Sequence, residues 1–183
     1  MENVSINKSI RLSEHISLGE VIKSSHTEIY NIPSHVAIEN LKRVCVWLEA
    51  LRYRYNQRYV TLPLQGEMEE VTKPGRERPP LTPPVGGGLE EPIIINSGYR
   101  SPELNKKVGG SPNSNHLTGC AVDIRVAGIE QALRYAVILM DYADETQQDY
   151  DELLIERNKS GRYWLHFAVC PKDNRRKTMF LRV

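Results

Sequence analysis

Apolar residues repeat at helical spacing in two long segments of the chain. Between residue 33 and about residue 55 they form one stripe, made of Ala37, Leu41, Val44, Leu48 and Leu51. Between residue 129 and about residue 142 they form a second stripe, made of Ile129, Leu133, Ala136, Val137 and Met140. Spacings of three and four residues are typical of helices that pack one face against a core.

Capping signals predict two shorter helices. Ser17-Leu18-Gly19-Glu20 has the hydroxyl and the carboxylate of a capping box, so we expect a short helix to begin there. Ser101 is a good N-cap, and Pro102 suits the first helical position. That helix is predicted to run to about Val108 and to end at Gly109-Gly110.

Short runs of β-branched or alternating apolar residues predict four strands. They cover residues 93–96, 121–126, 153–155 and 164–169, and Asn158-Lys159-Ser160-Gly161 has the composition of a hairpin turn between the last two. Helices flanking a small, mostly antiparallel sheet make an α+β domain.

Residues 61–92 differ from the rest of the chain. They are rich in proline and charge, contain Gly86-Gly87-Gly88 and show no apolar period. We expect a long exposed loop inside a single domain that spans residues 1–183. A domain boundary is the less favoured reading, because the helix before this stretch is too little to fold alone.

Composition and charge exclude several classes of protein. Hydrophobic residues make up 40% of the chain and charged residues 26%, and the net charge of +1 gives no footprint of nucleic-acid binding. No signal peptide is evident, and no apolar run is long enough to span a bilayer. We therefore expect a monomer that is cytoplasmic as synthesised, with no nucleic-acid partner and no membrane span.

We expect neither the cysteines nor the one basic cluster to form a functional site. Cys45, Cys120 and Cys170 are far apart and odd in number, which argues against a disulfide framework and a cysteine-type zinc site. We expect each to be a small buried residue. The cluster Arg175-Arg176-Lys177 is expected to be a solvated tail or turn.

Two of the predicted strands carry a metal-capable side chain away from their apolar face. Alternation puts Asp123 on the polar face of residues 121–126, and His166 on the polar face of residues 164–169. His116 lies seven residues before Asp123, in a loop that could fold it back over the strand. Two imidazoles and one carboxylate suit a zinc ion that keeps its fourth position open.

Several motifs occur in an order that is typical of one peptidase family. Residues 114–123 read SxHxxGxAxD, residues 97–105 read SGYRSPxLN, and residues 164–166 read WxH. Together they resemble the zinc D-Ala-D-Ala metallopeptidase family of carboxypeptidases, dipeptidases and phage endolysins. Leu12-Ser13-Glu14-His15 also resembles the LSEHF stretch of its carboxypeptidase subgroup. The resemblance spans the chain except for about residues 56–90.

The resemblance implies a D-Ala-D-Ala carboxypeptidase/hedgehog-like metallopeptidase fold with zinc on His116, Asp123 and His166. Arg100 would hold a substrate carboxylate or polarise the scissile carbonyl, and Ser114 would help to bind the substrate peptide. A surface salt bridge for Arg100 and a local backbone hydrogen bond for Ser114 are the plainer alternatives. Gly119 and Ala121 would be small so that loop and strand can approach the metal.

The general base is where the sequence departs from the family pattern. Many members place an acid three residues before the last histidine, and this chain has Tyr163 there. Glu156 resembles the acid of the LIxE segment in the carboxypeptidase subgroup, so we predict it as the base. Glu152 and Asp151 are the alternatives, and a non-catalytic glutamate at a strand end is nearly as compatible with the sequence.

The length of the hairpin turn tests the choice of Glu156. A four-residue turn over 158–161 would pair Glu156 with Tyr163 and put it on the wrong face. A five-residue turn over 158–162 would pair it with Trp164, on the face of His166. Glu156 can therefore serve as the base only with the longer turn.

The resemblance implies zinc-dependent hydrolysis of peptidoglycan stem peptides, by a D-Ala-D-Ala carboxypeptidase or by an endolysin-type endopeptidase released to the cell wall. Glu156 would accept a proton from water at the metal, and Arg100 would help to stabilise the oxyanion. Two other functions stay open. One is a hydrolase triad of Ser114, His116 and Asp123; the other is a metal-binding, catalytically inactive peptidase-like module, which Tyr163 keeps under consideration.

Overall fold

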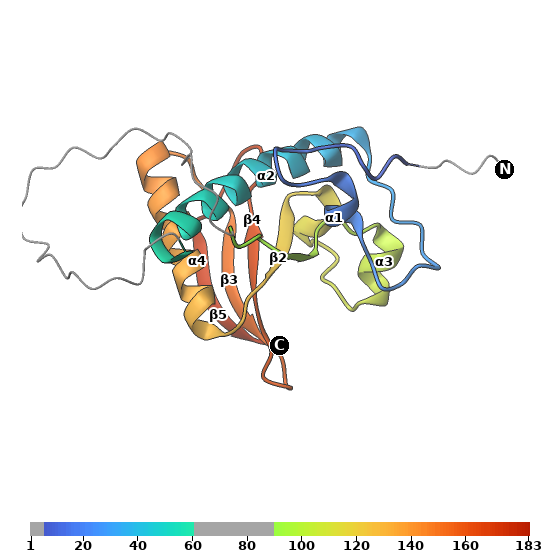
Figure 1. The fold of residues 1–183 in the computed structure, drawn as a ribbon. Helices are drawn as coiled ribbons and strands as arrows, with labels where there is room; N and C mark the ends of the chain where they lie inside the picture. Colours follow the sequence, from blue (N-terminus) through green and yellow to red (C-terminus); the bar gives the residue numbers. More distant parts are fainter. Residues whose placement is uncertain (1–5, 61–89) are drawn as a thin grey trace, which may run out of the picture.

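A computed structural model of the chain describes residues 6–60 and 90–183 (Figure 1). Most of the expected loop at 61–92 lies outside these residues. The elements, in chain order, are α1 (Leu18–Ile22), α2 (His35–Tyr55), the π-helix η1 (Asn56–Val60), β1 (Ile95–Ser97), α3 (Pro102–Lys107), the 3-10 helix η2 (Asn115–Thr118), β2 (Ala121–Arg125), α4 (Ile129–Thr146), β3 (Glu152–Arg157), β4 (Tyr163–Ala168) and β5 (Lys177–Arg182).

The strands form one sheet in the order β1-β2-β4-β3-β5. The pairs β1–β2, β2–β4 and β3–β4 are antiparallel, whereas β3–β5 is parallel. The predicted α+β class is confirmed, and the sheet is mixed. The four predicted strands are present, with small shifts in their ends.

Helices α2 and α4 cover one face of this sheet (Figure 1). The predicted stripe of α2 is confirmed, because all five of its residues are buried. Trp47 of the same helix lies against Phe167 of β4, with ring centroids 5.4 Å apart. The apolar side chains of β2, β3 and β4 point towards these helices, so the opposite face of the sheet carries the polar residues.

The predicted face of α4 is wrong. Ile129, Leu133 and Val137 are exposed, and of the predicted stripe only Ala136 is fully buried. The helix has apolar residues on more than one side, and it buries a neighbouring stripe of Ala132, Tyr135, Ala136, Ile138, Leu139 and Ala143. Three of these six residues are alanines, so the buried face combines small side chains with large ones.

The edge strand β5 has no counterpart among the predicted strands. It lies beside β3 in parallel, and its side chains are mostly exposed, so it lacks the apolar alternation of a half-buried strand. The basic cluster Arg175-Arg176-Lys177, which leads into β5, is not a free tail. Arg175 binds Asp151, Arg176 binds Asp144 and Asp149, and the strand begins at Lys177.

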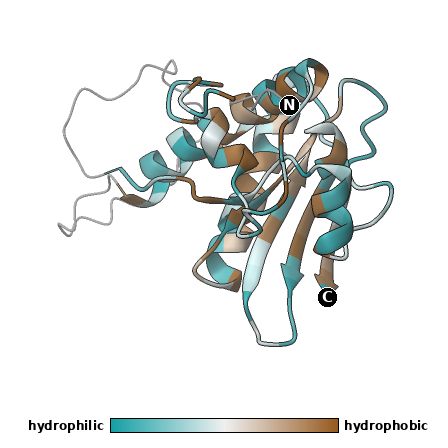
Figure 2. Cartoon of the chain, turned by 90° about the vertical axis from the view of Figure 1, so that its right-hand side faces the viewer, coloured by the Kyte–Doolittle hydropathy of each residue, from teal (hydrophilic) through white to brown (hydrophobic). Residues whose placement is uncertain are grey.

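The turn between β3 and β4 has five residues, 158–162, as the choice of Glu156 requires. Glu156 pairs with Trp164, and Arg157 pairs with Tyr163. The turn is hydrophilic and projects beyond the end of the sheet (Figure 2). Its length therefore sets the face on which each residue of β3 lies.

The chain on either side of residues 61–89 is joined by hydrogen bonds. Asn56 donates to the carbonyl oxygen of Glu91 at 3.0 Å and accepts from the backbone N–H of Glu91 at 2.7 Å. The two ends of this stretch are thus held beside each other.

The cysteines are all free. Cys45 and Cys120 are buried as expected, and burial raises the pKa of Cys45 to about 12. Cys170 is only partly buried, so the expectation for it is wrong. None of the helices in the described part of the chain is both long and apolar enough to cross a membrane.

Candidate metal centre

His116 is carried by a short turn that its neighbours define. Ser114 caps η2 by accepting a hydrogen bond from the backbone N–H of His116 at 3.4 Å. Gly119 ends the turn in the left-handed conformation, with φ at +74°. The chain then enters β2, so the turn and the strand that carry two of the candidate ligands are only a few residues apart.

Gly119 is small for a different reason from the one that the family resemblance implies. A Cβ atom at this position would collide with the backbone carbonyl oxygen of Ala37 in α2. The positive φ is itself costly for any residue with a side chain. The glycine therefore fits the turn against α2, and its backbone N–H donates to the carbonyl oxygen of His116 at 3.3 Å.

Asp123 and His166 lie directly opposite each other on the antiparallel strands β2 and β4. Residues opposite each other in such a pair project from the same face, with Cβ atoms about 5 Å apart. Their apolar neighbours on both strands fill the core between sheet and helices. The predicted alternation is confirmed, and it places both side chains on the polar face.

Ring nitrogens of His116 and His166 converge on one oxygen atom of Asp123. His116 Nε2 lies 3.3 Å from Asp123 Oδ1, and His166 Nδ1 lies 3.0 Å from the same oxygen. All three residues are buried. Ligands bound to zinc at about 2.0–2.1 Å in a tetrahedron lie about 3.3 Å apart, so these separations fit a zinc ion.

A backbone contact fixes the orientation of the first imidazole. His116 Nδ1 lies 2.6 Å from the carbonyl oxygen of Gly98 and is therefore the protonated ring nitrogen. This tautomer leaves the lone pair of Nε2 directed at Asp123 and available to a metal. A Cβ atom on Gly98 would collide with the carbonyl oxygen of Val21, which explains the glycine of the SGYR segment.

Charge at the site favours a carboxylate beside two imidazoles. Burial opposes ionisation of Asp123, but the contacts with His116 and His166 hold the pKa of this carboxyl well below its usual range. Burial likewise opposes a charge on His166, whereas its hydrogen bonds to Asp123 and Glu152 raise its pKa to about 9. The cluster thus attracts positive charge, as a cation-binding site must.

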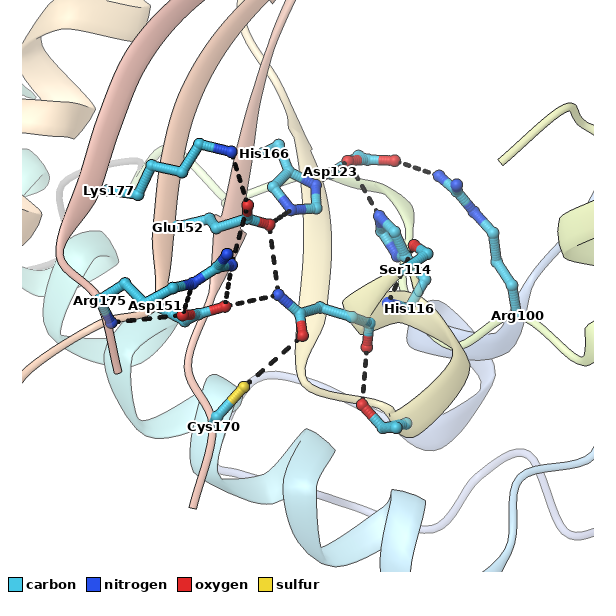
Figure 3. Close-up of polar contacts among 12 residues, drawn as sticks. Arg100, Ser114, His116, Asp123, Asp151, Glu152, His166, Cys170, Arg175 and Lys177 are labelled. Carbon is cyan, nitrogen blue, oxygen red and sulfur yellow. Dashed lines mark hydrogen bonds and ion pairs between the residues drawn. The ribbon is translucent and has the colours of Figure 1, made fainter. Parts of the chain in front are cut away.

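Arg100 contacts the candidate ligand directly. Its Nη2 forms an ion pair with Asp123 Oδ2, and its Nε donates to the hydroxyl of Ser97 at 2.9 Å. One carboxylate oxygen of Asp123 therefore faces the imidazoles and the other faces Arg100 (Figure 3). Arg100 thus forms a salt bridge, as the plainer alternative has it, but its partner is a candidate metal ligand and both side chains are largely buried.

The sequence-predicted residues line a common cavity of about 570 Å³. Its lining includes the three metal candidates together with Arg100, Ser114 and Glu156. Trp164 and Val108 add apolar surface to it. The cavity thus includes the three candidate ligands, Arg100, Ser114 and the preferred base, but neither of the alternative bases.

Glu156 reaches this cavity through the register of the hairpin. Its partner Trp164 lies two residues before His166 on β4, so both project from the site face. Burial raises the pKa of Glu156, against the lowering effect of His166. Tyr163 faces the other way and lies near Phe180, with ring centroids 6.3 Å apart, so it does not point into the site.

The two alternative acids are paired with basic residues from the region of β5. Asp151 receives two hydrogen bonds from Arg175, at 2.6 and 2.7 Å. Glu152 contacts Lys177 at 3.1 Å and Arg175 at 3.0 Å, and its hydrogen bonds to His166 and Lys177 lower its pKa to about 2. Neither lines the cavity as Glu156 does.

The Ser114, His116 and Asp123 side chains are not arranged as a hydrolase triad. The hydroxyl of Ser114 meets the backbone N–H of His116 and not its ring. The ring nitrogens of His116 face Gly98 and Asp123. A relay needs the serine on one ring nitrogen and the acid on the other, so this alternative is wrong.

Sequence reasoning missed one contributor to the site, the Gly98 carbonyl, and named a second, Glu152, only as an alternative base. The Gly98 carbonyl could not be found from side-chain chemistry, because its role depends only on backbone position. Glu152 lies on the same face of β3 as Glu156, because the two are four residues apart. Strand alternation could therefore have placed it beside His166.

Comparison with known proteins gives one family match. No curated protein matches the chain. Residues 84–147, which include Arg100, His116 and Asp123, match the family model described as Peptidase M15. Residues 84–147 are thus similar to the Peptidase M15 family, and the buried cluster of His116, Asp123 and His166 could hold a metal ion.

Proposed function

We propose that the chain is a zinc-dependent peptidase that hydrolyses peptide bonds in peptidoglycan stem peptides. One observation carries the proposal: His116 and His166 turn ring nitrogens to the same oxygen of Asp123, in a cavity that also holds Glu156. The match to the M15 family supports the reaction class. Substrate identity rests on the resemblance of the sequence motifs.

Zinc would be held by His116 Nε2, Asp123 Oδ1 and His166 Nδ1. When bound, zinc lowers the pKa of water and polarises a carbonyl oxygen. Glu156 is the proposed general base: its carboxylate accepts the proton of the attacking water and then passes it to the leaving amine. Its raised pKa suits an acid that must both accept and return a proton.

Arg100 and Ser114 would act on the substrate side of the cavity. Arg100 already neutralises the second oxygen of Asp123, and its guanidinium lines the same cavity. It is placed to stabilise a developing oxyanion or to bind a carboxylate of the peptide. The hydroxyl of Ser114 would bind the peptide while it caps the His116 turn.

The proposed unit is a single peptidase domain over residues 1–183. The hydrogen bonds between Asn56 and Glu91 support this arrangement, because they join the two sides of the 61–89 stretch. We propose a monomer that acts as a D-Ala-D-Ala carboxypeptidase or as an endolysin-type endopeptidase at the cell wall. The position of the cut bond distinguishes these two modes.

The test is digestion of purified peptidoglycan and of stem peptides, with the products identified by mass spectrometry. Wild type with zinc is expected to release defined peptide fragments, and a chelator is expected to stop the release. Glu156→Gln is expected to lower kcat by about 10²–10⁴ fold. Glu103→Gln, an exposed glutamate on α3, is the matched control and should keep wild-type activity.

A metal-binding, catalytically inactive module is the second candidate. The observation that favours it is Tyr163, which occupies the position of the usual acid and points away from the site. This function would hold if the wild type binds zinc but cleaves no stem peptide or peptidoglycan. Cleavage that depends on Glu156 would exclude it.

A further inference from the structure

Glu152 lies on the same face of β3 as Glu156, on the other side of His166. Its cross-strand partner is Ala168, whereas His166 itself lies opposite Leu154. The two glutamates therefore flank the histidine along the strand. They differ in what surrounds them, because Glu156 lines the cavity and Glu152 lies within a network of polar side chains (Figure 3).

The two oxygens of Glu152 point to different parts of the molecule. Oε1 meets Lys177 Nζ at 3.1 Å and Arg175 Nη2 at 3.0 Å, and both cations come from the region of β5. Oε2 meets His166 Nε2 at 3.5 Å and Asn115 Nδ2 at 3.2 Å. The carboxylate thus connects the outer strand of the sheet with the candidate metal centre.

Both contacts of Oε2 reach a segment that carries a candidate ligand. His166 turns Nδ1 towards Asp123 and Nε2 towards Glu152. With a metal on Nδ1, the proton of the ring would be on Nε2, from which it can be donated to Glu152. Asn115 directly precedes His116 and also donates to Asp151 at 2.8 Å. A carboxylate behind a ligating histidine fixes the ring and raises its strength as a ligand.

We infer that Glu152 is a positioning residue, which aligns His166 for the metal and holds the His116 turn through Asn115, and that Lys177 and Arg175 keep this carboxylate in place. The inference rests on the proposed function only in that a metal occupies the centre. The edge strand β5 then serves the site as well as the sheet.

The test is the zinc dissociation constant, measured by competition with a chelating indicator. Glu152→Ala is expected to bind zinc about 10–100 fold more weakly than wild type. Glu152→Gln keeps a neutral acceptor for His166 and should fall between the two. Glu156→Gln is the matched control, because it changes the other glutamate beside His166 and should keep wild-type affinity while it loses activity.

Two further measurements separate positioning from simple stabilisation. The absorption spectrum of the cobalt-substituted protein should change in Glu152→Ala, and saturating zinc should restore much of its activity. Lys177→Met, at a partly exposed position, should weaken zinc binding in the same direction without unfolding the chain. Circular dichroism of the metal-free proteins checks the fold.

The outcomes distinguish this inference from the proposed function. If Glu152→Ala and Lys177→Met bind zinc as tightly as wild type and give the same cobalt spectrum, the positioning role is wrong. That result would stand even if wild type hydrolyses peptidoglycan. Zinc binding that depends on Glu152 in a wild type without hydrolysis would uphold the positioning role and reject the peptidase.

Discussion

Gly119 links the His116 turn to the strand of Asp123, and two separate constraints act on it. Its φ of +74° is unfavourable for residues with a side chain, and a Cβ atom would collide with the Ala37 carbonyl. Gly109 shares the first constraint, with φ at +72°, but nothing lies within 4 Å of its Cβ position. The pair therefore separates backbone strain from close packing.

Gly119→Ala is expected to lose more stability than Gly109→Ala. The left-handed backbone costs each variant about 1–2 kcal/mol of unfolding free energy. The collision with α2 adds to this at residue 119 and displaces His116, so zinc affinity should fall there as well. Denaturant unfolding and zinc titration of both variants provide the measurements. Equal losses would show that the contact with α2 is unimportant.

At the residue scale, the sequence predicted the candidate ligands and the proposed base. Strand alternation put Asp123 and His166 on the polar face, and the family resemblance supplied the ligand set and Glu156. The length of the hairpin turn was the condition that Glu156 had to meet. What alternation cannot predict is the partner of each ligand, since Gly98 and Glu152 meet the histidines only through tertiary packing.

Helix α4 shows where an apolar pattern is ambiguous. Leu133 is 52% exposed although it belongs to the predicted stripe, whereas Ile138 is fully buried. Both faces carry large apolar side chains, and three of the six buried residues are alanines. Counting apolar positions alone therefore does not show which face of α4 packs on the sheet.

Substitutions on the two faces of α4 should have unequal effects. Ile138→Ala is expected to destabilise the fold by about 2–5 kcal/mol, because it leaves a cavity against the sheet. Leu133→Ala should change the unfolding free energy by about 0.5 kcal/mol or less, as at other exposed positions. Urea unfolding of both proteins measures the difference. A larger loss for Leu133→Ala would contradict the observed orientation of the helix.

The start of β3 should make the stability depend on pH in the acid range. The hydrogen bonds from Arg175 lower the pKa of Asp151 in the folded protein below its ordinary value of 3.8. Stability from this pair is therefore present above that ordinary value and is lost as the pH falls through the folded pKa.

Asp151→Asn is expected to be about 2 kcal/mol less stable than wild type at neutral pH, as for other hydrogen bonds between charged groups. The difference should shrink as the pH falls below about 4, because the wild-type carboxyl is then protonated. Thermal unfolding across this range measures it. A difference that stays constant with pH would assign the effect to packing and not to charge.

On the scale of the whole molecule, the two faces of the sheet have different roles. One face packs on α2 and α4, and the other carries the candidate metal centre with its supporting acids. The α+β class and the strands β1, β2, β3 and β4 were predictable, since each of these strands has a clear apolar pattern. The parallel edge strand β5 could not be predicted, because its side chains are mostly exposed. It also pairs with β3, from which β4 separates it along the chain.

The central claim is that three segments of the chain, η2, β2 and β4, meet to hold one metal ion. Its most direct test is elemental analysis of wild type and of His166→Ala, first purified without added metal and then after zinc is offered. We predict about one zinc per wild-type chain and a marked loss in the variant. A wild type that holds no metal even after zinc is offered would contradict the ligand assignment and leave only a resemblance of fold.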